Sequence, residues 1–201
     1  TKAELDEIDR KTRKTLTMYG AFNPNSNVDR LYLARKQGGR GLISIVDCVS
    51  QEKNNLSWYV KHSVEPLLKE VGKQGVVDID KAREPEKVRK EVFCQHKQGW
   101  LEKKLHGKMV SEVSESMDDE RTWLWVQKGG LKKETESTIF AAQEQAIRTN
   151  AIKQCIDKQD VSPLCRMCGK WPETIAHITI ECHQLAGHEY KLWRHNKVAQ
   201  V

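Results

Sequence analysis

Near its C-terminal end the chain reads Cys165-Arg-Met-Cys-Gly-Lys-Trp-Pro-Glu-Thr-Ile-Ala-His-Ile-Thr-Ile-Glu-Cys182, with three cysteines and one histidine at the spacing C-x2-C-x8-H-x4-C. Zinc binds four such ligands tetrahedrally, and a Cys3His set is a closed structural site without a position for substrate. Gly169 permits a sharp turn directly after Cys168. The spacing therefore predicts a zinc knuckle with one structural Zn2+ on Cys165, Cys168, His177 and Cys182.

The second half of the knuckle leaves the identity of the fourth ligand open. Pro172-Glu-Thr174 predicts a helix start, with proline early and an acidic residue in the first turn. His177 would project from that helix. Cys182 follows five residues later, off the same helical face, so we expect the helix to loosen at its end. His183 or His188 is the alternative fourth ligand, and the alternative for the whole cluster is reduced cysteines without metal.

Composition excludes several classes of protein. The 201 residues carry 34 Lys+Arg and 28 Asp+Glu, a net charge of +6, with a mean hydropathy of -0.70. No apolar run is long enough to span a membrane, and no signal peptide is recognisable. A disulfide scaffold is disfavoured, and Cys48, Cys94 and Cys155 are predicted to be small core residues. We expect an intracellular, nuclear and cytoplasmic protein that makes no membrane contact, cut from a longer chain.

The rest of the chain predicts a mainly α fold, a multi-helix array with one short β-hairpin. The hairpin pairs Leu31–Leu33 with Leu42–Ile43 across a turn at 38–41, where Gly38 and Gly39 supply positive φ. A capping box at Thr1 and Glu4 starts the first helix, and Gly20 ends it. The expected helices are 1–20, 44–59 (capped by Ser44), 65–71 (ended by Gly72), 86–113 (weakened by Gly99), 116–130 and 133–156. In the fifth, Trp123 and Trp125 are assigned to core packing rather than to base stacking.

Three segments follow from this pattern: 1–45 with the basic hairpin, a helical linker at 46–160, and the knuckle at 161–201. Residues 1–45 hold nine Lys/Arg and five Asp/Glu, an excess of +4. An excess of this kind suits a nucleic-acid contact. The glycines at 38–41 fit no phosphate-binding motif, so no small-molecule substrate is expected.

Two further runs extend the pattern. Asp29-Arg-Leu-Tyr-Leu-Ala-Arg-Lys-Gln-Gly-Gly-Arg-Gly-Leu42 lies near the start, and Gln145-Ala-Ile-Arg-Thr-Asn150 precedes the knuckle. Together with 165–168, Glu173-Thr-Ile-Ala-His-Ile178 and Cys182, they resemble the C-terminal region of a non-LTR (LINE-type) retrotransposon reverse transcriptase. The resemblance implies the end of the thumb, a helical linker and a CCHC zinc knuckle.

The resemblance also implies a function. In that family this region grips template RNA and target DNA during target-primed reverse transcription, and its partners are RNA, DNA and the rest of the polymerase chain. The paired aspartates of a polymerase site are missing upstream of the thumb, and Asp118 and Asp119 are assigned to a helix start instead. No endonuclease segment is present. We therefore expect a non-catalytic nucleic-acid-binding module.

Charge and placement select the candidate contacts to nucleic acid. They are basic residues in the first helix, the hairpin and the knuckle region: Arg10, Arg13, Lys14, Arg35, Lys36, Arg40, Arg148, Arg166 and Lys170. The alternative function is a zinc-braced helical scaffold that binds a protein partner and has no direct role with nucleic acid. In that case Trp123, Trp125, Trp171 and Trp193 would matter more than Arg35 or Arg148.

Overall fold

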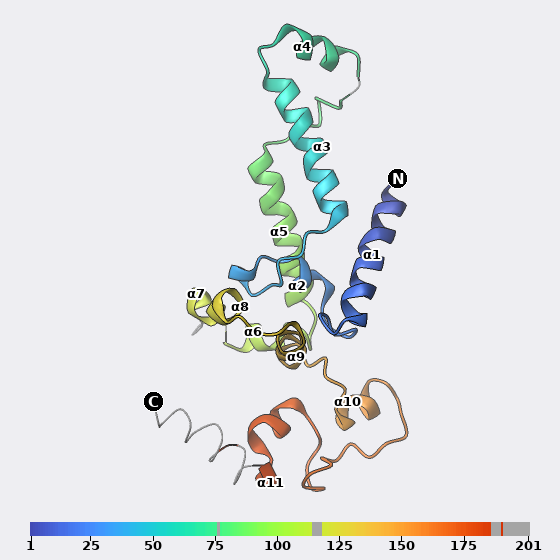
Figure 1. Cartoon of the computed structure of the whole chain (residues 1–201), viewed down its shortest axis with the longest axis vertical. Coiled ribbons are helices and arrows are strands. Elements are labelled where there is room, and N and C mark those ends of the chain that lie inside the picture. Colours follow the sequence, from blue (N-terminus) through green and yellow to red (C-terminus); the bar gives the residue numbers. More distant parts are fainter. Residues whose placement is uncertain (76, 114–117, 186–189, 191–201) are drawn as a thin grey trace. The chain divides into compact units, whose positions relative to one another are not determined.

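The computed structural model describes residues 1–75, 77–113, 118–185 and 190, and these residues are mainly helical (Figure 1). The chain divides into two compact units, Thr1–Ser137 and Thr138–Val201. The helices are α1 (Lys2–Met18), α2 (Val28–Tyr32), the 3-10 turn η1 (Arg35–Gln37), α3 (Ile45–His62), α4 (Pro66–Lys73), α5 (Pro85–Leu101), α6 (Lys108–Val113), α7 (Asp119–Thr122), α8 (Leu124–Lys128), α9 (Lys133–Gln143), α10 (Asn150–Cys155), the π-helical turn η3 (His177–Glu181) and α11 (His183–Leu185). None of the described helices has the length and apolar character needed to cross a membrane.

The first helix begins and ends where its sequence predicts. The Thr1 hydroxyl accepts a hydrogen bond from the Glu4 N–H, and the Glu4 side chain reaches back to the backbone of Thr1, which completes the capping box. Gly20, directly after the C-cap, has φ +68. Asp9 is buried, and its carboxylate accepts bonds from the Ser44 hydroxyl and the Ile45 N–H, both at 2.9 Å. This carboxylate ties α1 to the positive end of α3.

The predicted β-hairpin is wrong, because Leu31 and Tyr32 lie in the short helix α2. The Asn27 side chain caps that helix, accepting the Arg30 N–H at 3.0 Å, and this local bond outweighs the strand preference of two apolar residues. The described residues contain no sheet, and their one isolated β-bridge joins Leu164 to Pro172. The chain does reverse direction after α2, since the Leu42 N–H donates to the Leu31 carbonyl at 3.1 Å.

Two glycines permit this reversal for different reasons. Gly38 has φ +79, a conformation that favours glycine, as its sequence position predicts. The demand on Gly39 is steric, because a Cβ there would lie 2.1 Å from the Leu33 carbonyl oxygen. The sequence identifies the turn but assigns positive φ to both residues, whereas only Gly38 and Gly41 adopt it in this loop.

Replacing Gly39 with alanine is expected to destabilise the first unit by about 2 kcal/mol, because backbone must move to accept the methyl group. Gly75→Ala is the matched control: φ there is +71 and a Cβ meets nothing within 4 Å. That control should cost only about 1 kcal/mol of left-handed strain. The free energy of unfolding of both variants is measured by urea unfolding, with amide hydrogen exchange in α2 and α5 as the readout. Equal losses would show that the contact with Leu33 imposes no constraint.

A buried arginine between two tryptophans forms the centre of the first unit. Trp100 and Trp123 are each 2% exposed, and the Arg30 guanidinium carbon lies 4.4 Å and 5.4 Å from their ring centroids. The Arg30 Nε donates to the Gly38 carbonyl at 2.8 Å. Core packing of Trp123 is therefore confirmed, whereas Trp125 is only half-buried.

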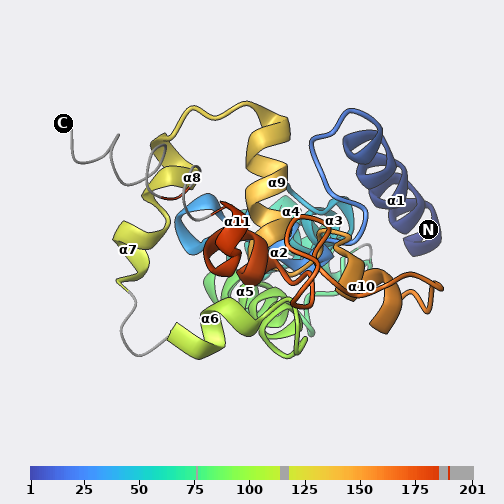
Figure 2. The same ribbon diagram turned by 90° about the horizontal axis from the view of Figure 1, so that it is seen from below.

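Helices α3 and α5 pack side by side, with α2 against α5 (Figure 1). His96 of α5 bridges its neighbours: Nδ1 lies 3.1 Å from an oxygen of Asp29 on α2, and Nε2 lies 2.8 Å from an oxygen of Asp47 on α3. Gly99 lets α2 approach, because a Cβ at that position would lie 2.7 Å from the Asp29 carboxylate. Helices α7 and α8 pack against η1 (Figure 2).

Several predicted helices have different limits in the structure. The expected helix 86–113 is divided into α5 and α6 by a turn. The indole N–H of Trp100, near the end of α5, donates to the His106 carbonyl of this turn at 3.0 Å. The expected helix 133–156 is α9 and α10, separated at Gln145, where φ is +55. Trp123 interrupts the helix predicted over 116–130 and separates α7 from α8. Helix α4 continues past Gly72 to Lys73. Ser116 and Met117 of the expected 116–130 start lie outside the described residues.

The three remaining cysteines are not core residues. Cys48, Cys94 and Cys155 are exposed, so their assignment to the core is wrong.

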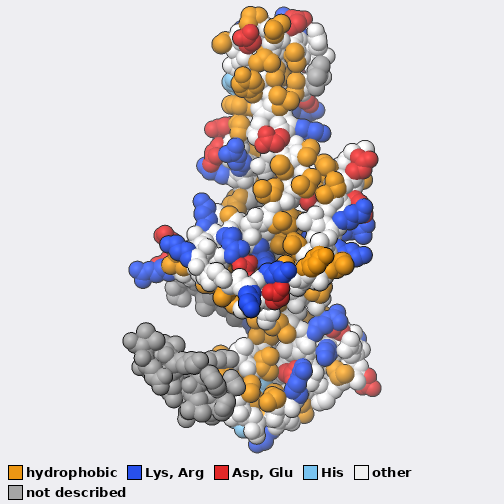
Figure 3. Space-filling model, in the orientation of Figure 1, with side chains coloured by type: hydrophobic (Ala, Val, Ile, Leu, Met, Phe, Trp, Pro, Cys, Tyr) orange, Lys and Arg blue, Asp and Glu red, His pale blue; other side chains and the backbone are white. Residues whose placement is uncertain are grey.

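The end of the first unit at α4 exposes apolar side chains. Hydrophobic side chains gather over α4 at the upper end of Figure 3. Val64 and Leu67 there are 86% and 74% exposed.

Candidate metal centre

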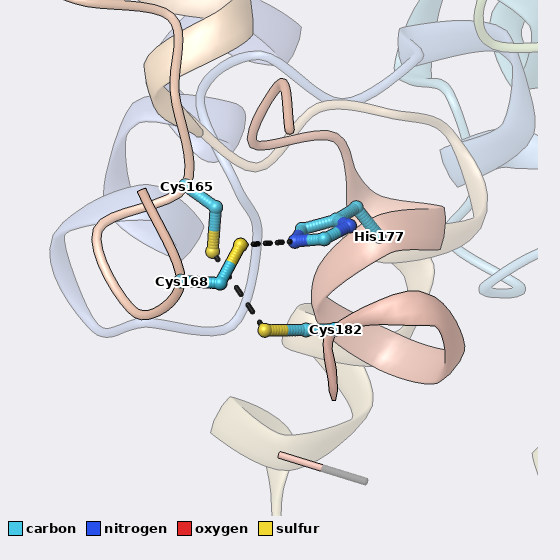
Figure 4. Close-up of side chains that lie close together, drawn as sticks. All are labelled: Cys165, Cys168, His177 and Cys182. Atoms are coloured by element: carbon cyan, nitrogen blue, oxygen red, sulfur yellow. Dashed lines mark hydrogen bonds between the residues drawn. The ribbon is translucent and has the colours of Figure 1, made fainter. Parts of the chain in front are cut away.

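Four side chains of the second unit converge on one point (Figure 4). The three sulfurs and one imidazole nitrogen of Cys165, Cys168, His177 and Cys182 all lie within 4.8 Å of one another. The Cys165 and Cys182 sulfurs are 4.0 Å apart, and the Cys168 sulfur lies 3.3 Å from Nε2 of His177. Cys165, His177 and Cys182 are buried, and Cys168 is half-buried. This cluster could bind one metal ion.

The first cysteine pair sits on a tight turn closed by backbone hydrogen bonds. The Cys165 N–H donates to the Trp171 carbonyl at 2.7 Å, and the Gly169 N–H donates to the Cys165 carbonyl at 2.7 Å. Gly169 has φ +64, the conformation that its position after Cys168 predicts. The Met167 N–H points at the Cys165 sulfur at 3.4 Å. The turn thus presents both sulfurs on one side.

Backbone donors and burial give the two thiols of this turn different acidities. The N–H of Lys170, followed by that of Trp171, holds the pKa of the Cys168 thiol down at about 6. Burial raises the pKa of Cys165. Cysteine binds metal ions as the thiolate, and the backbone donors of this turn favour that form of Cys168.

The second pair lies on either side of a π-helical turn. Thr174 accepts the His177 N–H at 3.0 Å on its hydroxyl oxygen, and η3 follows directly. The Cys182 N–H donates to the His177 carbonyl at 2.8 Å, a bond between residues five apart. The predicted loosening of this helix is confirmed, and it brings the Cys182 sulfur to the same side as the His177 ring.

The structure also separates the candidates for the fourth ligand. Cys182 is 0% exposed and belongs to the cluster, whereas His183 is exposed and does not. His188 and Trp193 lie outside the described residues. Pro172 is part of the bridge with Leu164 rather than of a helix start.

Sequence reasoning missed the role of Glu173, which it assigned to the first turn of a helix. The side chain is buried, 2% exposed, and accepts four hydrogen bonds. Two come from the guanidinium of Arg166, at 2.8 Å and 2.6 Å, and two from the backbone N–H groups of Arg166 and Asn150, both at 3.0 Å. These donors, Arg166 first, lower the pKa of Glu173 to about 2. Glu173 therefore joins the cysteine turn to the start of α10.

The predicted nucleic-acid contacts fall into two groups. Three are exposed lysines whose side chains make no hydrogen bond or ion pair in the described part of the chain: Lys14, Lys36 and Lys170. The other six contact acceptors within their own unit: Arg10 binds Glu7, Arg13 binds the Tyr32 hydroxyl, Arg35 and Arg40 bind Glu136, Arg148 binds Asp157, and Arg166 binds Glu173. A contact of any of the nine with nucleic acid stays a prediction.

Arg35 and Arg40 share one buried carboxylate. Their guanidinium nitrogens lie 2.6 Å and 3.2 Å from the oxygens of Glu136, and Arg35 also donates to the Val126 carbonyl at 2.8 Å. These bonds fasten the loop after α2 to α8 and to the beginning of α9. Nothing in the local sequence signals this pairing, because its partners are about a hundred residues apart.

Comparison with protein families, with curated proteins and with solved structures finds no match.

Proposed function

We propose that this chain is a nucleic-acid-binding module with one structural zinc ion, belonging to a LINE-type reverse transcriptase that acts inside the cell. The closed Cys3His cluster is the observation that carries the zinc module, and the sequence resemblance described above is what suggests the family. Three sulfurs and one imidazole are the soft and borderline ligands that zinc prefers, and four of them fill its tetrahedral shell. Zinc here holds the fold, so the module is not an enzyme by itself.

The surface of the second unit supports a role with nucleic acid. Lys170 is exposed beside the cysteine turn, and the side chains of Arg166 and Arg148 are 62% and 52% exposed despite their ion pairs. Trp171, next to Lys170, is 63% exposed. Cations that meet phosphates and aromatic rings that stack on bases are the two components of sequence-tolerant single-strand binding. Within a polymerase such a module would position template RNA and target DNA.

Binding of the whole chain to a structured RNA and to duplex DNA tests this proposal. Affinity should fall about tenfold or more between about 50 and 200 mM salt, because each neutralised phosphate releases counterions. The double variant Cys165→Ser, Cys168→Ser should lose the binding, whereas Cys155→Ser, an exposed cysteine outside the cluster, should keep it. Affinity that is independent of salt, or equal in the double variant, would contradict the proposal.

A second candidate function is a scaffold that docks a protein partner, and the tip of the first unit favours it. Val64, Leu67 and Tyr59 are 86%, 74% and 63% exposed around α4 and the end of α3 (Figure 3). Exposed apolar patches of this kind mark interaction sites. If the chain with metal bound holds neither RNA nor DNA, this function becomes the better account.

A further inference from the structure

A groove opens beside the metal centre in the second unit. It has a volume of about 360 Å³ and is lined by Trp171, Pro172, Thr174, His177 and Glu181. The zinc proposal uses only one of these residues, His177, whose Nε2 faces the cysteine sulfurs. The groove therefore sets two polar side chains, those of Thr174 and Glu181, beside the exposed ring of Trp171.

The ring of Trp171 is presented by a rigid backbone. Its carbonyl accepts the Cys165 N–H at 2.7 Å, and its own N–H donates to the Cys168 sulfur. The next residue, Pro172, is fixed by its bridge to Leu164. The indole is nevertheless 63% exposed. A large ring that is both anchored and open to solvent is a stacking platform for a planar ligand.

The polar lining of the groove selects the ligand. Glu181 is exposed, and its carboxylate offers two oxygens that only accept hydrogen bonds. The hydroxyl oxygen of Thr174 already accepts the His177 N–H, so its O–H can donate. A carboxylate repels phosphate, so the groove itself suits the base, and Lys170 beside Trp171 suits the neighbouring phosphate.

The geometry points to an unpaired guanine of a single-stranded RNA or DNA segment as the occupant of this groove, an inference that rests on the proposed function. Guanine alone among the four bases presents two adjacent donors, N1–H and the 2-amino group, which match the two oxygens of Glu181. On the same edge, adenine, cytosine and uracil all place an acceptor beside their donor. Base pairing hides this edge, so the base must be unpaired.

Fluorescence anisotropy with ten-nucleotide RNAs tests the assignment on the full, zinc-loaded chain. The probes are oligouridine and the same strand with one central guanosine, adenosine or inosine, which lacks the 2-amino group. The guanosine strand should bind about tenfold more tightly than the others. Trp171→Ala should lower its affinity about tenfold, and Trp171→Phe should restore most of the loss. Glu181→Gln should remove the preference for guanosine, whereas the control Asp160→Asn, an exposed carboxylate outside the groove, should keep the preference and leave oligouridine binding unchanged.

The outcomes separate this inference from the function on which it rests. Salt-dependent binding with equal affinity for all four strands, or a guanosine preference that survives in Glu181→Gln, overturns the guanine assignment and leaves the nucleic-acid proposal standing. Absence of binding to every strand overturns both. If a proline-rich peptide binds and Trp171→Ala abolishes that binding while RNA is not bound, the groove belongs to a protein partner. One equivalent of bound metal in every variant shows that the knuckle is intact.

Discussion

Removing the metal is expected to unfold the second unit, Thr138–Val201, and to leave the helices of the first unit in place. The described part of this unit buries few apolar side chains besides the cysteine ligands: Phe140, Ala141, Ala146 and Ile175. A core of this size cannot offset the conformational entropy of folding. Zinc supplies about 10–16 kcal/mol of apparent binding free energy in small structural sites, and this energy is folding energy.

Amide hydrogen exchange before and after treatment with a chelator measures this effect. Protection should disappear in α10 and η3 and remain in α3 and α5. The variant Cys165→Ser, Cys168→Ser should behave as the chelated protein does. Cys155→Ser, the same chemical change at an exposed cysteine outside the cluster, should keep one bound zinc and full protection. Loss of protection in α3 and α5 on chelation would contradict the independence of the two units.

The parts of the structure that the sequence predicts well are those held by local bonds. The caps at Thr1 and Ser44 depend on residues three positions away, and both are present. The four residues of the Cys/His cluster, which could bind one metal ion, lie within one stretch of eighteen residues. The requirement that they meet at a point also predicts the loosened turn before Cys182. When four side chains of a short segment must meet at one point, few backbone conformations of that segment are possible.

The parts that the sequence predicts poorly depend on partners far along the chain. Leu31 and Tyr32 have the composition of a strand, but the Asn27 cap and the burial of Arg30 between Trp100 and Trp123 select a helix. In the same way, only the fold reveals that Arg35 and Arg40 share the carboxylate of Glu136. Their sequence gives the charge of the two side chains but not the partner about a hundred residues away.

Glu173→Gln is expected to lower zinc affinity about 10–100-fold, although residue 173 is not a ligand, because groups that support metal ligands contribute at this level. The substitution keeps the size of the side chain but replaces one accepting oxygen with an amide NH2 group, which is itself a donor and faces N–H donors. The backbone N–H groups of Arg166 and Asn150 carry most of the effect, since the Arg166 side chain is 62% exposed and its ion pair is screened by water. We expect the second unit to lose about 3 kcal/mol of stability.

Competition with a zinc-binding dye measures the affinity, and Asp160→Asn, an exposed carboxylate of the same unit, is the control. An affinity within twofold of the parent chain would show that Glu173 does not support the cysteine turn. Arg166→Gln then separates two roles of the arginine. If its guanidinium mainly holds Glu173, the variant loses zinc affinity along with RNA affinity. If it mainly contacts phosphate, RNA affinity falls and zinc binding is unchanged. In that second case the slope of log affinity against log salt concentration decreases by about one, the value for one lost phosphate contact.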